Sequence, residues 1–308
     1  MTAPAVLVED LHVAYGKTWA LDGVDLTAAA GTTLGVLGHN GAGKTTLIRT
    51  LATLVRPTVG RVQIEGLDVA AADQVRRRIG VTGQYAGLDE FLTARENLEL
   101  IGRLTGLRRT ARARADALID RLGLQEYASR RVGELSGGSR RRVDLAASLV
   151  GSPSVLFLDE PTTGLDPLAR AGLWNVVDEL TDAGTTVALT TQYLEEADRL
   201  ADHIVVLRRG RVAARGTPAE LKRIVGGKVL SATIPAGQLA ALPFIPDTDP
   251  RVDGDHLRVS VTVDDAPAAT ALVADLHRGG IEVTDLDVTS PSLDDVFTHL
   301  AHTPGAHR

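Results

Sequence analysis

A glycine-rich octapeptide stands near the start of the chain and reads Gly38-His39-Asn40-Gly41-Ala42-Gly43-Lys44-Thr45. It fits the pattern G-x-x-x-x-G-K-[S/T] of a phosphate-binding loop, in which glycines let backbone N–H groups turn inward around phosphate oxygens. The apolar run Thr33–Leu37 predicts a strand before it, and helical periodicity begins at Lys44. We therefore expect a strand–loop–helix unit that binds a polyphosphate. Lys44 would reach the β- and γ-phosphates and Thr45 would offer its hydroxyl to Mg²⁺.

A second apolar run ends in two acids, because Val155–Leu158 is followed by Asp159 and Glu160. Such a run is typical of a strand buried in a parallel sheet, and α/β folds place ligands at the carboxyl ends of these strands. We expect Asp159 to hold Mg²⁺, directly or through water, and Glu160 to orient and deprotonate the attacking water. Taken alone, the pair is equally well explained as a strand that happens to end in two acids before Pro161. The phosphate loop in the same chain favours the catalytic interpretation.

Strand and helix patterns alternate along the first two thirds of the chain. The predicted strands are Val6–Val8, Leu11–Tyr15, Thr33–Leu37, Arg61–Ile64, Ile79–Thr82, Ser154–Leu158, Thr186–Thr190 and a hairpin of His203–Leu207 with Arg211–Ala214. The predicted helices are Lys44–Leu54, Ala94–Gln125, Leu168–Ala183 and Tyr193–Ala201. This order predicts an α/β fold, with a mixed, largely parallel sheet and helices on both sides.

The charge balance changes near Gly226. Residues 226–308 contain 5 of the 33 basic and 12 of the 39 acidic side chains. This shift predicts a boundary between a nucleotide-binding domain, residues 1–225, and a small C-terminal accessory α+β domain, residues 226–308. For the second domain we predict strands at Val229–Thr233, Leu257–Val263 and Glu282–Val288, with helices at Ala266–His277 and Leu293–Leu300.

Composition excludes several classes of protein. Hydrophobic residues make up 44% of the 308 residues, which is too many for a disordered chain. Cysteine is absent, so disulfides, zinc fingers, iron–sulfur clusters and thiol catalysis are excluded. No signal peptide and no membrane-spanning run is recognisable, so we expect a chain that is soluble on its own and can lie against a membrane partner. Eleven arginines lie between Arg103 and Arg142, and we interpret them as a solvated helical face rather than a surface for anionic lipid. Since aromatic residues make up only 3% of the chain, we expect no nucleic acid partner.

A second glycine-rich stretch, Leu135-Ser136-Gly137-Gly138-Ser139, resembles the signature loop of ATP-binding-cassette (ABC) ATPases. It lies between the phosphate loop and the pair Asp159 and Glu160, which is the order found in that family. Tyr15 is similar to the family's adenine-stacking aromatic, Gln84 to its Q-loop glutamine, and residues 164–166 to the stretch before its D-loop. Tyr15 is also explained as a buried strand aromatic, and Gln84 as a surface residue. The resemblance covers about residues 6–219. It implies a P-loop ABC ATPase domain with a mixed sheet core, an antiparallel β subdomain and a helical signature subdomain.

The resemblance also implies a site for ATP and Mg²⁺. The nucleotide-binding residues would be Tyr15, Gly38, His39, Asn40, Gly41, Ala42, Gly43, Lys44, Thr45, Thr46, Ser136, Gly137 and Gly138. The catalytic residues would be Glu160, Lys44, Gln84 and Gln192, and the metal ligands Thr45, Gln84 and Asp159. In this family the signature loop caps the γ-phosphate of ATP bound to the opposite subunit. A homodimer with ATP sandwiched between its subunits is therefore implied.

Ser139, where the family usually has glutamine, and His39, where proline is common, are minor departures from the family pattern, and a larger one lies in the switch loop. A histidine usually follows the strand that corresponds to Val187–Thr190, but this chain has Gln192 in the loop there. A glutamine side chain can donate a hydrogen bond to the γ-phosphate, but it cannot carry a proton or a positive charge. We therefore predict slow hydrolysis with Glu160 as the base.

Three runs, residues 190–197, 140–146 and 291–297, resemble the daunorubicin-resistance type of exporter ATPase. This resemblance implies a separate membrane permease of the ABC-2 type as partner, efflux of an amphipathic drug, antibiotic or lipid, and a location at the cytoplasmic face of a bacterial cell membrane. Phe91 and Leu92 would contact the permease or belong to the core. The competing interpretation is a soluble ABC-type ATPase that acts on another macromolecule. A phosphate-loop kinase or GTPase is disfavoured by the signature loop.

Overall fold

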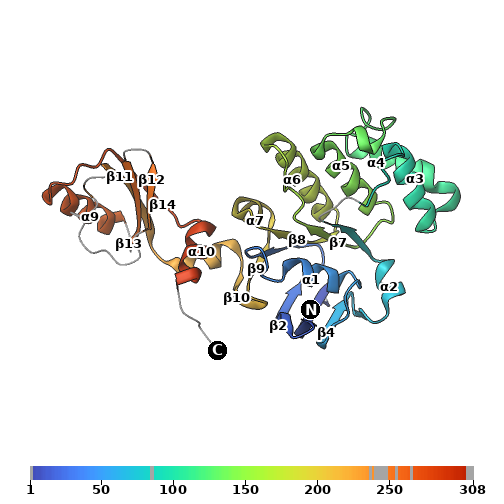
Figure 1. Cartoon of the computed structure of the whole chain (residues 1–308), viewed down its shortest axis with the longest axis horizontal. Coiled ribbons are helices and arrows are strands. Elements are labelled where there is room, and N and C mark those ends of the chain that lie inside the picture. The colour runs from blue at the N-terminus through green and yellow to red at the C-terminus, as the bar shows by residue number, and fades with distance from the viewer. Residues whose placement is uncertain are drawn as a thin grey trace. The chain divides into compact units, whose positions relative to one another are not determined.

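The computed structural model describes residues 3–83, 87–235, 238, 249–253, 256–263 and 266–302. The chain divides into two compact units, Met1–Thr217 and Pro218–Arg308, which are drawn in Figure 1. Helix α8 (Pro218–Val225) groups with the second unit, so this division falls one short helix before the change in charge balance near Gly226.

A six-stranded sheet forms the centre of the first unit, with the strand order β10-β9-β3-β8-β7-β6. Its strands are β3 (Thr33–Leu37), β6 (Ile79–Thr82), β7 (Val155–Asp159), β8 (Thr186–Thr191), β9 (His203–Arg208) and β10 (Arg211–Gly216). Neighbouring strands are parallel, except that β10 runs antiparallel to β9. Strands β3, β7 and β8 are buried along their whole length, because helices and a second sheet cover both faces.

A four-stranded antiparallel sheet lies over one face, in the order β2-β1-β4-β5. Its strands are β1 (Val6–Tyr15), β2 (Thr18–Ala28), β4 (Val59–Ile64) and β5 (Leu67–Asp68). The two strands predicted at the N-terminus are parts of one strand, β1. Its pairing register with β2 shifts between Val8 and Leu11, where Asp10 takes a φ of 47°. This irregularity resets the apolar alternation, so the sequence suggests two strands. Strand β2 was not predicted, and a glycine with a φ of 70°, Gly23, interrupts its pattern.

The central sheet separates two apolar cores. Val155 and Phe157 of β7 pack with the antiparallel sheet and α1 (Lys44–Leu51). The alternate residues Leu156 and Leu158 pack with the helices of the opposite face. Because successive side chains of a strand point to opposite faces, a fully apolar strand supplies both cores at once.

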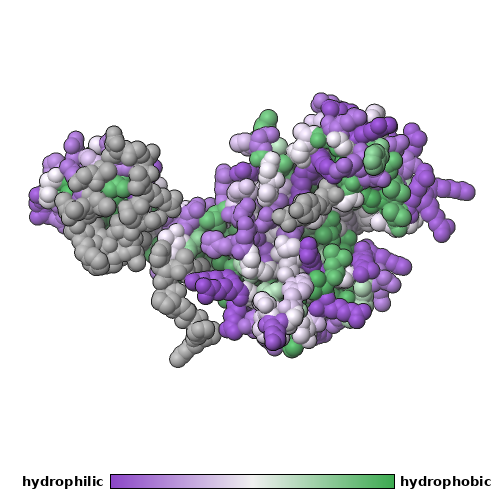
Figure 2. All heavy atoms as spheres, in the orientation of Figure 1, coloured by the Kyte–Doolittle hydropathy of each residue, from purple (hydrophilic) through white to green (hydrophobic). Residues whose placement is uncertain are grey.

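The helices α3, α4, α5 and α6 gather on that opposite side (Figure 1). The helices of this unit besides α1 are α2 (Ala72–Arg76), α3 (Ala94–Leu104), α4 (Ala111–Arg121), α5 (Gly137–Ser148), α6 (Pro167–Asp182) and α7 (Leu194–Leu200), with short 3₁₀ turns η1 (Arg108–Thr110) and η2 (Val132–Glu134). The prediction of one helix over Ala94–Gln125 is wrong, because Gly106 takes a φ of 96° and separates α3 from α4. The outer rim of this group is largely hydrophilic in Figure 2.

The hairpin of β9 and β10 turns at Arg209 and Gly210, as predicted, and both residues have positive φ values of 49° and 79°. The N–H of Gly210 donates to the carbonyl oxygen of Ala42 at 2.9 Å. A Cβ at Gly210 would lie 2.7 Å from the Ala20 oxygen, so no larger residue fits. The turn thus supports the phosphate loop through the hydrogen bond from Gly210 to Ala42.

The second unit contains a four-stranded antiparallel sheet in the order β12-β13-β11-β14. Its elements after α8 are β11 (Lys228–Pro235), β12 (Asp249–Asp253), β13 (His256–Val263), α9 (Ala266–Arg278), β14 (Asp285–Thr289) and α10 (Leu293–His302). Ile234, Leu257 and Val259 of the sheet pack with Leu276 and Ile281. The predicted α+β architecture is confirmed, although the last strand begins three residues later than expected and β12 was not predicted. Within the described residues, none of the helices combines the length and apolar character needed to cross a bilayer.

Candidate nucleotide-binding and hydrolysis site

The phosphate loop connects β3 to α1, and glycine is required at two of its positions. A Cβ at Gly38 would lie 2.6 Å from the Leu207 oxygen, and one at Gly43, where φ is 109°, would lie 2.7 Å from the Ala20 oxygen. Gly43 is also the N-cap of α1, and no side chain caps this helix end. The first N–H groups of an α-helix have no partner within the helix. An uncapped helix end behind a glycine loop is therefore suited to binding an anion.

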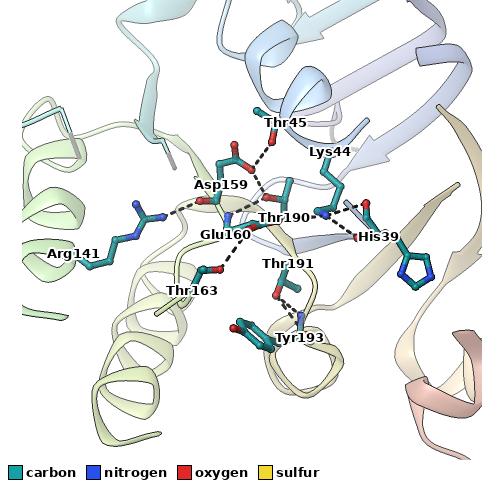
Figure 3. Close-up of polar contacts among 11 residues, drawn as sticks. His39, Lys44, Thr45, Arg141, Asp159, Glu160, Thr163, Thr190, Thr191 and Tyr193 are labelled. Atoms are coloured by element: carbon teal, nitrogen blue, oxygen red, sulfur yellow. Dashed lines mark hydrogen bonds and ion pairs between the residues drawn. The ribbon is translucent and has the colours of Figure 1, made fainter. Parts of the chain in front are cut away.

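Lys44 is buried beneath this loop (Figure 3). Its ammonium donates to the carbonyl oxygen of Gly38 at 2.7 Å and lies 3.4 Å from the carboxylate oxygen Oε1 of Glu160. A longer contact reaches the His39 oxygen at 3.4 Å. The cation is therefore placed between the loop and the strand end that carries Glu160, where a phosphate would meet both.

Asp159 ends β7 and collects two hydroxyl groups from other elements (Figure 3). Thr190 of β8 donates to Oδ1 at 2.6 Å, and Thr45 of α1 donates to the same oxygen at 3.4 Å. Hydroxyl and carboxylate oxygens are the ligands that Mg²⁺ prefers in proteins. The residues Thr45 and Asp159 thus fit a magnesium ion. The contribution of Thr190, which orients the carboxylate, was missed at the sequence level.

Glu160 takes a left-handed backbone conformation, with a φ of 49°. Its N–H is fixed by Thr190, whose carbonyl oxygen accepts at 3.1 Å and whose hydroxyl accepts at 3.0 Å. A non-glycine residue in this region costs about 1 kcal/mol or more, and such strain collects at functional sites. The conformation turns the Glu160 carboxylate back toward Lys44 instead of leaving it along the strand.

Two buried carboxylates outside this cluster have raised pKa values. Burial raises the pKa of Asp144 on α5 to about 6, despite the nearby Arg141 guanidinium. Burial also raises the pKa of Glu196 on α7, which accepts a hydrogen bond from the Trp174 indole at 3.2 Å. Desolvation disfavours the charged form of each acid. Neither residue was singled out by its sequence pattern.

The signature loop occupies a different part of the unit. Ser136 is the N-cap of α5, and its hydroxyl accepts from the N–H of Ser139 at 3.2 Å. Ser136 and Gly137 are exposed, and Gly138 is half-buried. Figure 1 separates the start of α5, in the helical group, from α1 and its loop. The structure therefore does not bring these residues into the Lys44–Asp159 cluster of the same chain.

Most of the other predicted residues are exposed or half-buried. Tyr15 is 51% exposed at the end of β1, so its interpretation as a buried strand aromatic is wrong. His39, Asn40 and Gln192 are exposed, and Thr46 is half-buried. Phe91 is 84% exposed and is not a core residue, whereas Leu92 is half-buried. Gln84 lies outside the described residues.

A strand–loop–helix with Gly38–Thr45, facing acids at the end of a neighbouring strand, defines the chain as a P-loop nucleotide hydrolase. Comparison with known proteins then narrows the class. Residues 21–163 match the ABC transporter family, and residues 216–301 match the C-terminal domain described as "ATP-binding protein DrrA1-3-like".

Relatives are similar along almost the whole chain. The chain is 52% identical to the daunorubicin resistance ATP-binding protein DrrA3 of Streptomyces coeruleorubidus, over 97% of this chain and 96% of that protein. It is 47% identical to the daunorubicin/doxorubicin resistance ATP-binding protein DrrA of Streptomyces peucetius, over 99% and 94%. A dimeric ATP-binding cassette solved with ADP and Pi superposes with a TM-score of 0.63 at 26% identity, over 69% of this chain and 98% of that one.

The chain therefore belongs to the ABC transporter family of ATP-binding proteins. It binds and hydrolyses ATP as the ATP-binding subunit of such a transporter. The predicted fold and the resemblance to the drug-resistance type are confirmed.

Proposed function

We propose that Lys44, Thr45, Asp159 and Glu160 carry out this hydrolysis. Lys44 holds the β- and γ-phosphates, and Glu160 orients and deprotonates the attacking water. Thr45 and Asp159 would hold Mg²⁺, which when bound offsets the negative charge of the phosphate oxygens. The observation that carries the proposal is the 3.4 Å approach of the Lys44 ammonium to the Glu160 carboxylate, because it joins two distant motifs in one cluster.

The remaining nucleotide contacts are assigned around this cluster. The half-exposed Tyr15 ring stacks on adenine, and the backbone of residues 38–46 surrounds the phosphates. Gln192, exposed just after β8, donates a hydrogen bond to the γ-phosphate. The roles of Gln84 as a catalytic residue and a metal ligand follow from the resemblance to the family.

We further propose that two copies of this chain enclose two ATP molecules. The exposed Ser136 and Gly137 and the half-buried Gly138 at the start of α5 offer a second anion-binding surface, which is separate from the phosphate loop of the same chain. A second copy would bring its signature loop to this chain's γ-phosphate. The similar cassette solved with ADP and Pi is dimeric, which supports this arrangement. ATP would close the dimer and hydrolysis would release it.

The membrane partner is proposed to be a separate ABC-2 type permease, with this chain at the cytoplasmic face of a bacterial membrane. The cargo is an amphipathic drug, antibiotic or lipid, since relatives with matching length are daunorubicin resistance proteins. The exposed Phe91 is a candidate contact for the permease. Residues 1–225 would form the ATPase domain, and residues 226–308 would stabilise or regulate the dimer.

Substitution of Glu160 tests the catalytic assignment. Glu160→Gln is expected to lower kcat for phosphate release by about 10²- to 10³-fold while ATP still binds. Glu65→Gln is a matched control, because Glu65 also has a φ of 49° and forms an ion pair, with Arg78, outside the site. An unchanged rate in Glu160→Gln would show that another group activates the water.

Affinity isolation from gently solubilised native membranes tests the transport assignment. Recovery of a polytopic membrane protein in stoichiometric amount is the expected result, and it would identify the chain that binds the cargo. Recovery of the chain only from the soluble fraction would overturn the export proposal. The function would then be that of a soluble ABC-type ATPase acting on another macromolecule.

A further inference from the structure

Arg141 reaches from the signature helix α5 to the ends of two strands of the central sheet. Its guanidinium donates to the carbonyl oxygens of Gly83 at 2.5 Å, Asp159 at 2.8 Å and Pro161 at 3.0 Å. Gly83 directly follows β6, and Asp159 ends β7. Only 12% of the Arg141 side chain is exposed. The bond to the Asp159 oxygen is visible in Figure 3, on the side of the acid opposite Thr45.

Asp144, one turn further along α5, completes this cluster. One of its carboxylate oxygens lies 3.4 Å from the Arg141 guanidinium, and the other accepts the N–H of Gly87 at 3.3 Å. The pair therefore contacts main-chain groups at residues 83 and 87, and on both sides of Glu160. A buried guanidinium with three carbonyl acceptors and one carboxylate uses most of its five donors, which fixes its plane and therefore the four groups around it.

The placement of this arginine along the chain matters as much as its contacts. Ser136 caps the helix in which Arg141 lies, and five residues of α-helix rise about 7.5 Å. One rigid element thus carries the signature loop at its start and the bonds to the catalytic strand ends one turn later. Any displacement of α5 changes the geometry of these bonds, because three carbonyl oxygens bind one planar group.

We propose that Arg141 is a positioning residue for ATP hydrolysis, holding the main chain on both sides of Glu160 in register with the signature helix. The proposal rests on the function assigned above to Asp159, Glu160 and the signature loop. Arg141 acts on the main chain, so it is not itself a catalytic residue. The competing role is that of a counter-ion which only neutralises the buried Asp144.

Arg141→Gln is the primary test, measured on the full chain with its membrane partner or as the isolated ATPase. We expect kcat to fall about ten- to hundredfold, since small displacements of catalytic groups have effects of this size. The dissociation constant for ATP should change less than about threefold, because Lys44 and the phosphate loop are untouched. Arg141→Lys should recover only part of kcat, since an ammonium lacks the planar fork.

Arg142→Gln is the matched control. Arg142 is the next residue of the same helix, but its guanidinium donates to the carbonyl oxygen of Leu122 at 2.8 Å, away from the strand ends. Its loss should leave kcat within about twofold of the wild type. An equal fall of kcat in both variants would overturn the proposal, because general damage to α5 would then explain the result.

The double variant Arg141→Gln/Asp144→Ala separates positioning from charge neutralisation. If Arg141 positions the main chain, removing Asp144 should restore thermal stability but not kcat. Recovery of kcat in the double variant would overturn the proposal in favour of the counter-ion role. Failure of the underlying function is distinguishable, because Glu160→Gln would then retain its activity. An active Arg141→Gln beside an inactive Glu160→Gln would refute the positioning role alone.

Discussion

The phosphate loop before α1 and the signature loop before α5 are both rich in glycine, and both lead into a helix. They differ in how the helix end is satisfied. Gly43 gives α1 no side-chain cap, whereas the Ser136 hydroxyl caps α5 by accepting from Ser139. The first loop lies over the buried Lys44, whereas the second exposes Ser136 and Gly137.

In the proposed dimer, this difference separates the site that each chain builds for itself from the surface that it presents to the second copy. At α1, the missing cap leaves N–H groups for a phosphate, and the cation and acids are already in place. At α5, the serine cap keeps the helix end stable in water while no ligand is present. The two loops should therefore respond differently to substitution.

The largest effect on activity is expected at the phosphate loop, from loss of the buried Lys44 ammonium. Lys44→Met should lower kcat by about 10²- to 10³-fold and weaken ATP binding, because it removes the cation beside the phosphates. Phosphate release and fluorescent-nucleotide titration measure the two effects. Lys228→Met is the control, since Lys228 and its hydrogen-bond partner Ser290 both belong to the second unit. Normal ATP affinity in Lys44→Met would remove the basis for calling this loop the phosphate site.

The second largest effect is expected on the unfolding free energy, through Asp144, the buried acid of α5. The pKa of Asp144 is about 6 in the folded chain against an ordinary 3.8, so the folded state binds the proton more tightly. Its contribution to stability is complete below about pH 4, falls as the pH rises, and is lost above about pH 6. The unfolding free energy of the wild type, relative to Asp144→Asn, should thus fall by about 2 kcal/mol from pH 4 to 7. Urea unfolding at several pH values measures it, and a constant difference would contradict it.

Removal of the signature cap should have a smaller effect. Ser136→Ala should destabilise α5 by about 1 kcal/mol, because it removes the cap. If Ser136 also donates to the phosphate in the proposed dimer, the ATPase rate should fall by about tenfold. Ser148→Ala is the control at the other end of α5, where the hydroxyl donates to the Leu145 oxygen. A loss of stability with no change in rate would restrict Ser136 to capping.

The smallest effect is expected at Gln192. Gln192→His should change kcat by only about threefold at neutral pH, but the rate should gain a pH dependence near about pH 6.5, where histidine titrates. Gln192→Ala is the companion variant, which removes the hydrogen-bond donor without adding a titrating group. A flat pH profile in Gln192→His would show that this position does not reach the reacting phosphate.

The phosphate loop, the buried strands and the acids were predictable, because each depends on local residue types. Gly38 and Gly43 indicate a tight loop, and the apolar run before Asp159 indicates a buried strand. The orientation of the acids was not predictable in the same way. The left-handed backbone of Glu160 is fixed by Thr190, which lies on another strand.

Arg141 shows the same limit more clearly. Within the sequence it is the middle of three arginines, and nothing distinguishes it from Arg140 or Arg142. In the folded chain Arg140 forms an exposed ion pair with Glu90, whereas Arg141 is buried against the strand ends. Helical phase and the approach of distant strands decide between these neighbours, and neither is visible in composition or spacing.

The support of the phosphate loop by the β9–β10 hairpin has a consequence for the synthesis of this protein. The octapeptide leaves the ribosome early, but β9, one of the two strands that flank β3, and the turn at Gly210 that bonds Ala42 come about 160 to 165 residues later. At translation rates of about 5–20 residues per second, this delay is roughly ten to thirty seconds. A nascent or truncated chain that ends before the hairpin carries the complete motif without its finished shape. We therefore expect affinity for ATP to appear only near the end of translation of the ATPase domain, once the hairpin that supports the loop has been made.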